Sequence, residues 1–297
     1  MPRAIRIATA ALIGFLVLGS CFIAENAVHV WQHDAPRPYA ASALAGTWAV
    51  SSESAQVRAA DGVLLDAWLF TPAHPNGAGV ILMHGVGDNR MGMTGHAQFL
   101  LRAGYTVLLP DSRGHGGSGG PIISYGILEA ADIHRWADLL LRRPGVDRLY
   151  GVGQSMGAAI LLESLPSEPR FRALVADCAF ATFEEIAYDR LAQNGSPGRV
   201  VSWPVIHLGF IYARLRYGVN LWRASPADAV RGTHTPILLI HGANDDNIPP
   251  RHSRELHAAN PTATELWEVP GAGHVASITT QPEAYQRRVT QWFDTHR

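Results

Sequence analysis

The sequence predicts an α/β protein with a mostly parallel, eight-stranded sheet flanked by helices and with a helical cap insertion. Apolar runs alternate with helical patterns from about residue 55 onward, as expected for strands joined by crossover helices. Several of these runs are apolar throughout, which is typical of strands that helices cover on both faces. In residues 147–161 such a run leads through closely spaced glycines directly into a helix-forming stretch.

The N-terminal segment has a different composition from the rest of the chain. Arg3 and Arg6 precede the stretch Ile7–Ala24, which carries no charge. This stretch is long for the core of a signal peptide and just long enough for a membrane span. Because the next positive residue is Arg37, the charge pattern predicts a cytoplasmic N-terminus and a folded domain outside the cytoplasm, in a bacterial cell envelope.

Residues 1–24 are therefore expected to form a membrane anchor or a signal segment. An uncleaved anchor is the main expectation. Residues 18–21 loosely resemble a lipobox, so lipidation at Cys21 and a cleaved, secreted form are alternatives. Residues 25–54 contain Pro36 and Pro38 and are expected to be a tether. The range 55–297 is expected to be the folded domain.

Eight strands and five main helices are expected in that domain. The dipeptide Asp61-Gly62 predicts a hairpin between the first two strands. The expected strands are Gln56–Ala59, Val63–Phe70, Val80–Met83, Thr106–Leu109, Leu149–Val152, Ala173–Asp177, Ile237–Ile240 and Glu265–Val269. Helical patterns lie near 93–103, 125–142, 156–165, 252–259 and 283–295.

The long gap between the sixth and seventh strands predicts a cap insertion at about 180–228. A simple crossover needs far fewer residues. Thr182 and Glu185 form a capping box that opens a helix at Phe183. The apolar stretch Val200–Tyr217 follows. It has two possible roles, packing against the domain core or forming a lid that lines an acyl-binding pocket and touches the membrane.

A candidate nucleophile lies between the fifth strand and the next helix. The stretch Gly153–Gly157 matches G-x-S-x-G with Ser155 at its centre, in the strand–turn–helix context of a nucleophile elbow. Glycine is expected on either side of the serine because strand and helix backbones nearly touch there. Gly116–Gly120 fits the same pattern around Ser118. It follows no strand and leads into a proline, so we interpret it as a loop.

A serine hydroxyl needs a base to accept its proton and an acid to orient that base. His274 follows the last strand on a glycine-rich loop and is the expected base, because imidazole titrates near neutral pH. Asp245 follows the seventh strand and is the expected acid. Asp246 and Asp177 are alternatives for that role. The order Ser, Asp, His is the one expected for this layout.

Two backbone N–H groups are expected to form an oxyanion hole. Met156 follows the nucleophile and begins a helix, whose positive end favours negative charge. Val86 lies in the loop after the third strand, next to His84-Gly85. We expect His84 to shape this loop through hydrogen bonds rather than to act as a base.

Composition excludes several other classes of function. The net charge of −1 indicates no charge-driven nucleic-acid partner. All 24 basic residues are arginine, so no lysine is present to form a Schiff base. The two cysteines, Cys21 and Cys178, have no zinc-site spacing, and Cys178 is expected to be a buried apolar residue. No Walker or dinucleotide fingerprint occurs, and we expect neither a cofactor nor a metal.

From about residue 55 to the end, the chain resembles the α/β-hydrolase superfamily. Five motifs in the family's order carry this resemblance: His84-Gly85, the loop 111–116, the stretch 153–157, His241-Gly242 with Asp245, and Gly271–His274. The branch that it resembles holds small serine esterases, monoacylglycerol-lipase-like enzymes and serine aminopeptidase-like proteins, including membrane-anchored members. The resemblance implies that Asp111, Arg113 and His115 are structural supports near the site.

These observations predict a serine hydrolase that cleaves a small-molecule ester, which includes the option of an acyl lipid. Hydrolysis of amides or peptides by the same residues is the first alternative, because a triad alone does not select the bond. A non-catalytic binding protein on this fold is the second alternative. An elbow serine, rather than an aspartate, disfavours dehalogenase and epoxide hydrolase chemistry.

Overall fold

The centre of the computed structural model is one eight-stranded sheet with the strand order β1-β2-β4-β3-β5-β6-β7-β8. The structure describes residues 2–31, 33–37, 39–196 and 198–297. β1 pairs with β2, and β2 with β4, in the antiparallel direction, whereas the strands β3 to β8 all run parallel to one another. The strands are β1 (Ser51–Arg58), β2 (Leu64–Thr71), β3 (Ala78–Met83), β4 (Thr106–Pro110), β5 (Arg148–Gln154), β6 (Phe171–Asp177), β7 (Ile237–Gly242) and β8 (Thr264–Val269). The expected sheet is therefore confirmed.

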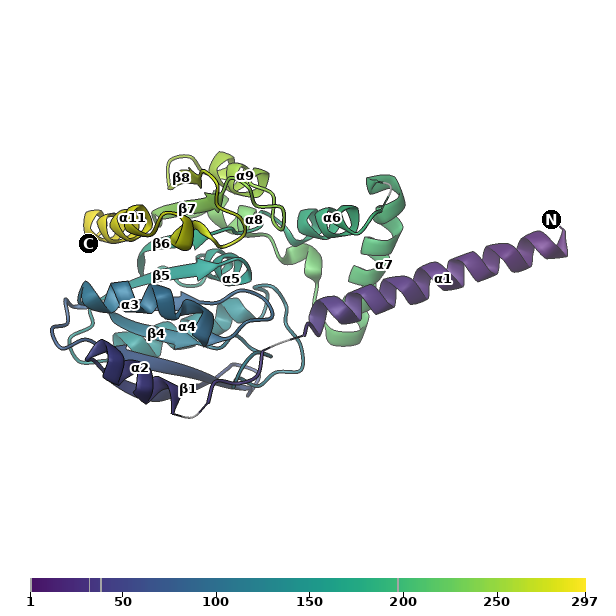
Figure 1. Ribbon diagram of the computed structural model, residues 1–297. Helices are drawn as coiled ribbons and strands as arrows, with labels where there is room; N and C mark the ends of the chain where they lie inside the picture. The colour runs from purple at the N-terminus through teal and green to yellow at the C-terminus, as the bar shows by residue number, and fades with distance from the viewer. Residues whose placement is uncertain (1, 32, 38, 197) are drawn as a thin grey trace.

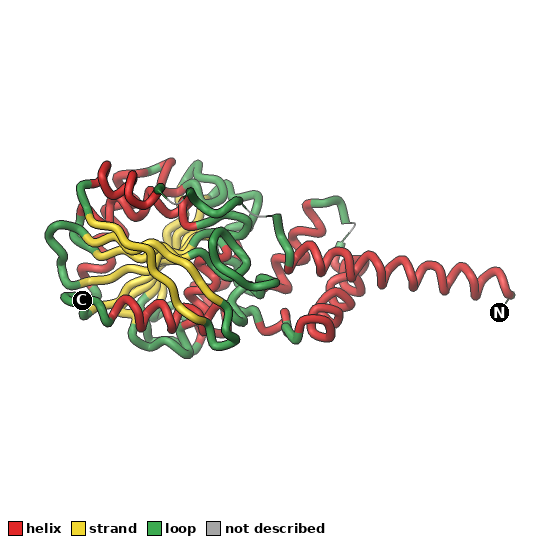
Figure 2. Tube along the Cα trace, turned by 90° about the horizontal axis from the view of Figure 1, so that it is seen from below, coloured by secondary structure: helices red, strands yellow, loops and turns green. Residues whose placement is uncertain are grey.

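Helices cover both faces of the sheet (Figures 1 and 2). Alternate residues of β3 belong to two separate cores, Ile81 and Met83 on one face and Val80 and Leu82 on the other. This alternation explains why the strand reads as apolar throughout. The helices are α1 (Arg3–Val28), α2 (Ala40–Trp48), α3 (Thr94–Arg102), α4 (Glu129–Leu141), α5 (Met156–Ser164), α6 (Phe183–Gln193), α7 (Arg199–Tyr217), α8 (Pro226–Arg231), α9 (Arg251–Ala259), α10 (Ser277–Thr280) and α11 (Pro282–Thr295), with single 3₁₀ turns η1 (Arg90–Met93) and η2 (Leu221–Arg223).

The expected tether at 25–54 differs from the structure. This range contains the end of α1, the whole of α2 and the start of β1. Ala41 and Ala45 of α2 are buried in the core, and the Trp48 ring packs edge-on against Phe70. Alanine is the strongest helix former, and it outweighs the influence of the two prolines that precede the helix.

Helix α4 begins later than expected, at Glu129 rather than near residue 125. The Glu129 carboxylate accepts hydrogen bonds from the N–H groups of Ser124 and Gly126, and these bonds hold the preceding segment in a turn. Tyr125 has a φ of 58° within that turn, which is incompatible with a helix.

The range 180–228, expected as a cap insertion, contains α6, α7, η2 and the start of α8 between β6 and β7. The hydroxyl of Thr182 accepts a hydrogen bond from the N–H of Glu185, and α6 starts at Phe183 as its sequence predicts. In Figure 1, α6 and α7 project beyond the sheet, and α7 lies beside α1.

Helix α1 extends away from the rest of the molecule (Figures 1 and 2). It is long and apolar enough to cross a membrane, with a mean hydropathy of 2.3 over its most apolar window, of which 11% is buried. Its C-terminal part packs against α7, where Ser20, Ala24 and Val28 are buried. One apolar helix near an N-terminus is compatible with an anchor and with a signal sequence.

Candidate active site

Ser155 lies on the sharp turn that connects β5 to α5. Its φ of 53° and ψ of −118° place it in a backbone region that non-glycine residues seldom adopt. Such strain persists only where the surrounding structure imposes it, and it is concentrated at functional sites. The N–H of Ser155 donates to the carbonyl oxygen of Asp177 on the neighbouring strand, at 2.8 Å, which holds the turn at the end of the sheet.

The glycines at either side of Ser155 allow this turn to form. A Cβ on Gly157 would lie 2.3 Å from the carbonyl oxygen of Met83, and one on Gly153 would lie 2.5 Å from the carbonyl oxygen of Gly157. Both distances are well inside van der Waals contact. The expectation that strand and helix backbones nearly touch here is therefore met.

The structure brings Ser155, His274 and Asp245 into one hydrogen-bonded chain. Nε2 of His274 lies 3.0 Å from Oγ of Ser155, and Nδ1 lies 2.7 Å from Oδ2 of Asp245. With the proton on Nδ1, His274 donates to Asp245 and accepts from the serine hydroxyl. This arrangement is the one in which imidazole can remove a proton from serine.

Asp245 is held as an anion. Its Oδ1 accepts hydrogen bonds from the N–H groups of Asn247 and Ile248, both at 2.9 Å. Burial raises the pKa of the carboxyl, but contacts with His241 and His274 and the N–H of Ile248 outweigh burial and hold that pKa well below its ordinary value. A charged carboxylate beside His274 stabilises the imidazolium that forms when the base accepts a proton.

The two alternative acids lie in different surroundings. Asp246 is exposed, and its backbone carbonyl accepts a hydrogen bond from Gln193. Asp177 is fully buried and contacts Cys178 and Ser277, and burial raises its pKa to about 6. Among the hydrogen bonds and ion pairs of the described residues, Asp245 is the one acidic residue whose carboxylate contacts His274.

Ser118, the centre of the second G-x-S-x-G match, has a structural role. Its hydroxyl donates to the carbonyl oxygen of Asp111 and accepts from the N–H of Asp66. The surrounding glycines form a loop, as expected. Nearby, the Asp111 carboxylate pairs with Arg90 at 2.6 Å, and Arg113 pairs with Asp132 at 2.7 Å.

The loop after β3 passes close to the candidate nucleophile. A Cβ on Gly85 would lie 3.9 Å from Oγ of Ser155, and Val86, Ser155 and Met156 line one cavity. Met156 is also the first residue of α5, where backbone N–H groups have no partner within the helix. Val86 and Met156, the residues expected to supply the oxyanion donors, thus line the same cavity as Ser155.

Two neutral histidines support that loop. Nε2 of His84 accepts from the N–H of Ser112, and Nε2 of His115 accepts from the N–H of Gly87. Burial lowers the pKa of His115 to about 4, and burial also lowers the pKa of His84. Because a protonated ring could not accept these bonds, both histidines stabilise the loop in their neutral form.

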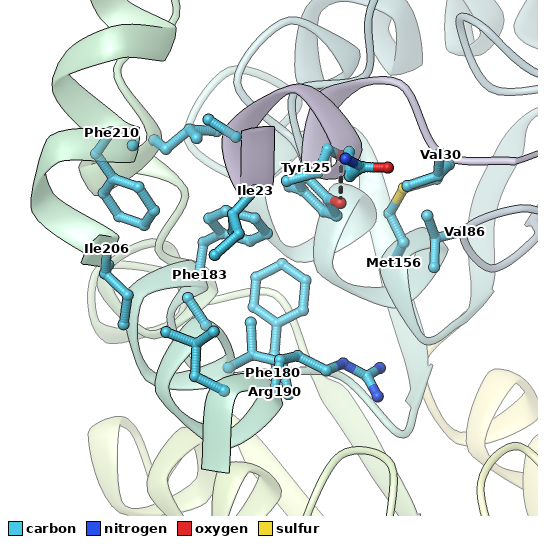
Figure 3. A pocket seen from close by; sticks show the side chains of 18 of the residues that line it. Ile23, Val30, Val86, Tyr125, Met156, Phe180, Phe183, Arg190, Ile206 and Phe210 are labelled. Atoms are coloured by element: carbon cyan, nitrogen blue, oxygen red, sulfur yellow. Dashed lines mark hydrogen bonds between the residues drawn. The ribbon is translucent and has the colours of Figure 1, made fainter. Parts of the chain in front are cut away.

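Ser155 lines a cavity of about 450 Å³, most of whose lining residues are drawn in Figure 3. This volume is within the range of pockets that hold small ligands, roughly 300–1,000 Å³. The wall is largely apolar and includes Phe180, Phe183, Ile206 and Phe210. All four lie in the range 180–228 expected as the cap insertion, and all four also belong to the main hydrophobic core. Residues of the apolar stretch therefore both pack in the core and line the cavity.

Sequence reasoning missed a second wall of this cavity. Ile23, Ala24, Ala27 and Val30, at the end of α1 and just beyond it, line the same space as Ser155. Figure 3 shows Ile23 directed toward the cavity between Phe183 and Tyr125. No local signal marks these residues, because an apolar helix has the same composition whether it faces lipid or a pocket.

Cys178, His241 and Asp245 are the one group of described residues whose atoms could hold a metal ion, with ligand atoms within 4.8 Å of one another. Each is already engaged. Nε2 of His241 donates to the carbonyl oxygen of Ile248, at 2.8 Å, and Asp245 bonds to His274. Burial raises the pKa of the Cys178 thiol strongly, which disfavours the thiolate that a metal needs. The cluster is better explained as a support for Asp245.

Three comparisons relate this chain to known proteins. Residues 80–287 match the profile described as "Alpha/beta hydrolase family". The protein YqkD of Bacillus subtilis is 31% identical over 219 residues, which cover 72% of this chain and 70% of YqkD. The uncharacterized peptidase YuxL of the same organism is 27% identical over 82% of this chain, but the match covers only 39% of YuxL.

Among solved structures, the esterase Pf2001 of Pyrococcus furiosus has a similar fold. The TM-score is 0.71 at 22% identity, and the match covers 89% of this chain and 98% of the esterase. At this identity the similarity establishes the fold alone. The sheet, the flanking helices and the strand order described above are thus those of an α/β-hydrolase fold.

Proposed function

The chain belongs to the alpha/beta hydrolase family, and we propose that it is a serine hydrolase that cleaves carboxylic esters through an acyl-enzyme. The observation that carries this proposal is the hydrogen-bonded chain from Ser155 through His274 to Asp245. The three residues come from three separate loops at one edge of the sheet. A purely structural role does not require a serine with a strained backbone that faces a cavity.

In the first half-reaction, His274 removes the hydroxyl proton of Ser155 as Oγ attacks the ester carbonyl. Asp245 keeps the proton of His274 on Nδ1 and stabilises the imidazolium. The backbone N–H groups of Val86 and Met156 stabilise the oxyanion, each contributing about 3 kcal/mol to lowering the barrier. His274 then gives its proton to the departing alcohol, and an acyl-enzyme remains.

In the second half-reaction, water takes the place of the alcohol. His274 removes a proton from the water as it attacks the acyl carbonyl, and the same two N–H groups hold the second oxyanion. Collapse of that intermediate returns the proton to Ser155 and releases the carboxylic acid. No group besides the chain's own residues and water takes part.

The cavity supports an ester with an apolar acyl part. Its wall around Ser155 is formed largely by aromatic and aliphatic side chains. Among the described residues that form this wall, Arg190 on α6 is the one with a charged side chain. A peptide amine would need an acidic partner, and the cavity lining of the described residues contains none. The similarity to YuxL supports amide hydrolysis as the second candidate.

A fluorophosphonate probe and a substrate panel test this proposal. We expect the probe to label Ser155 of the full-length protein in detergent. We also expect p-nitrophenyl esters to be hydrolysed at least about tenfold faster than matched aminoacyl p-nitroanilides, since the cavity offers no site for a charged amine. Faster cleavage of the anilides would favour the second candidate function, amide hydrolysis. Absence of labelling would contradict any serine hydrolase.

A further inference from the structure

Helix α1 packs into the catalytic domain at a close crossing with α7. A Cβ placed on Gly209 would lie 3.2 Å from the carbonyl oxygen of Ser20 and 3.5 Å from Cβ of Ala24. Ser20 and Ala24 are one turn apart on α1, and Gly209 and the buried Ala213 are one turn apart on α7. Pairs of small residues at this spacing let helix backbones approach closely, as they do inside membranes.

Polar contacts fasten the same end of α1. The Glu25 carboxylate accepts hydrogen bonds from the hydroxyls of Tyr212 and Tyr217. The hydroxyl of Tyr125 donates to the carbonyl oxygen of Ala27, at 2.7 Å, beside the cavity. Contacts of both kinds, apolar and polar, therefore join this end of α1 to the catalytic domain.

The cavity wall includes the residues at which the apolar part of α1 ends. The uncharged stretch Ile7–Ala24 spans about 27 Å as a helix, close to the thickness of a bilayer core. Ile23, in the last turn of that stretch, lines the cavity and is 41% exposed. Beyond it the rim becomes polar, with the exposed side chains of Asn26, Arg190 and Asn194.

Helix α7 also carries apolar side chains that are exposed. Val200 is 89% exposed and Leu215 is 82% exposed. Arg214 and Arg216 flank Leu215 and are exposed. Because α7 meets α1 at Ser20 and Ala24, it crosses no more than about 6 Å inside the end of the apolar stretch. That depth is typical of helices that lie in the headgroup region of a bilayer.

We propose that α1 is a retained wall of the substrate pocket, and that the substrate is a membrane-resident ester whose acyl chain enters from the bilayer past Ile23. The chain passes between α1 and the cap helices and places its carbonyl at Ser155. The polar rim keeps the headgroup at the water boundary. This inference rests on the proposed ester hydrolysis and adds the substrate class and its route.

A matched pair of substitutions on α1 tests the route. Ile23→Trp enlarges a side chain at the cavity, whereas Ile13→Trp makes the same change at an exposed position ten residues earlier, outside the cavity lining. The full-length protein is placed in phosphatidylcholine vesicles with p-nitrophenyl palmitate in the bilayer or p-nitrophenyl acetate in the water. Both substrates release the same chromophore.

We expect Ile23→Trp to lower the ratio of palmitate to acetate hydrolysis by about tenfold or more, because a filled groove excludes a long chain far more than a short one. Ile13→Trp should leave both rates within about twofold of wild type, since single surface changes have small effects. An unchanged ratio in Ile23→Trp would overturn the proposal. An equal loss of ratio in both variants would also overturn it.

A cysteine pair tests the packing without relying on catalysis. The Cβ separation of 3.5 Å between positions 24 and 209 falls within the disulfide range of about 3.5–4.5 Å. In a Cys21→Ser background, Ala24→Cys with Gly209→Cys should form a disulfide under mild oxidation in vesicles. The control, Ala11→Cys with Gly209→Cys, should form none, because position 11 lies about 20 Å away along the helix.

The two tests separate the possible failures. If the disulfide fails to form although thermal unfolding shows a folded variant, α1 does not pack on α7 and the inference is overturned. If the disulfide forms but the wild-type protein neither reacts with a fluorophosphonate nor hydrolyses either ester, the proposed function is overturned. The proposed substrate class is then overturned as well. In that case the packing of α1 on the domain would still stand as an independent result.

Discussion

Nε2 of His274 lies 3.0 Å from Oγ of Ser155, although 119 positions separate the two residues in the chain. We predict that Ser155→Ala lowers kcat/KM for p-nitrophenyl butyrate by about 10³-fold or more, because the nucleophile is removed. The midpoint of thermal unfolding should stay at or above the wild-type value, because the change from serine to alanine removes one hydroxyl and leaves the packing around it unchanged. Retained turnover in a purified variant would contradict the role of Ser155.

Asp245→Asn tests the assignment of Asp245 as the acid that orients His274. An amide at this position directs N–H toward Nδ1 of His274, which puts the imidazole proton on Nε2 and prevents that nitrogen from accepting the serine proton. We predict a fall in kcat of about 10³- to 10⁴-fold.

Asp246→Asn is the matched control for this change. Asp246 is exposed, and its substitution should alter kcat by less than about twofold. A larger loss in Asp246→Asn than in Asp245→Asn, measured with the same ester, would reverse the assignment of the acid.

Gly157→Ala tests the backbone contact beneath the elbow. The new Cβ would lie 2.3 Å from the carbonyl oxygen of Met83 and 2.5 Å from that of His84. Because backbone atoms cannot move aside as a flexible side chain does, we predict a loss of about 2 kcal/mol or more in the free energy of unfolding. Activity should fall as well, since the shift displaces Ser155.

Gly232→Ala provides the comparison for that variant. Gly232 ends α8 with a φ of −96°, and a Cβ there would meet no atom within 4 Å. Its effect on the free energy of unfolding should lie within about 0.5 kcal/mol. Equal destabilisation by both substitutions, measured by denaturant unfolding in detergent, would show that the contact at Gly157 is unimportant.

His96 should make stability depend on pH. Burial lowers its pKa from 6.5 to about 4, and its Nε2 pairs with the hydroxyl of Tyr285. Between pH 6.5 and 4 the unfolded chain therefore binds a proton that the folded protein excludes. Stability falls as pH falls through this window, by up to about 1.4 kcal/mol per pH unit for this residue.

His96→Phe should flatten that dependence, because the phenyl ring cannot be protonated. The measurement is the free energy of unfolding from denaturant titrations at pH 6.5, 5.5 and 4.5. His115, whose pKa is also lowered to about 4, retains its own contribution in the variant. An unchanged slope in His96→Phe would mean that the folded protein accepts the proton at residue 96.

Local patterns were sufficient to predict the sheet and the neighbourhood of Ser155. Several strands that helices cover on both faces contain nearly continuous apolar runs, and the elbow needs glycine at Gly153 and Gly157 for reasons that depend on a few adjacent residues. The loops with Asp245 and His274 were predictable because each follows a strand of a parallel sheet, and the carboxyl ends of such strands meet at one edge.

Long-range contacts account for what was missed. The role of Ile23 and Ala24 depends on α7, which follows almost two hundred positions later, and no local pattern records that crossing. Helix α2 was overlooked because Pro36 and Pro38 suggested an irregular segment, while its alanine-rich composition was the available signal. Among the candidate acids, the choice of Asp245 over Asp246 depends on which carboxylate turns toward His274.

The cavity wall formed by residues 23–30 has a practical consequence for recombinant work. Leader-type stretches are routinely trimmed to obtain a manageable enzyme, and a cut after residue 24 would remove Ile23 and Ala24 and leave Phe183 and Phe210 facing solvent. Such a preparation would retain Ser155, Asp245 and His274 and still turn over small test compounds. Its preference for the length of the substrate's acyl chain would reflect an open groove rather than the native pocket. Screening results from the trimmed and the untrimmed protein should therefore be compared before a physiological substrate is assigned.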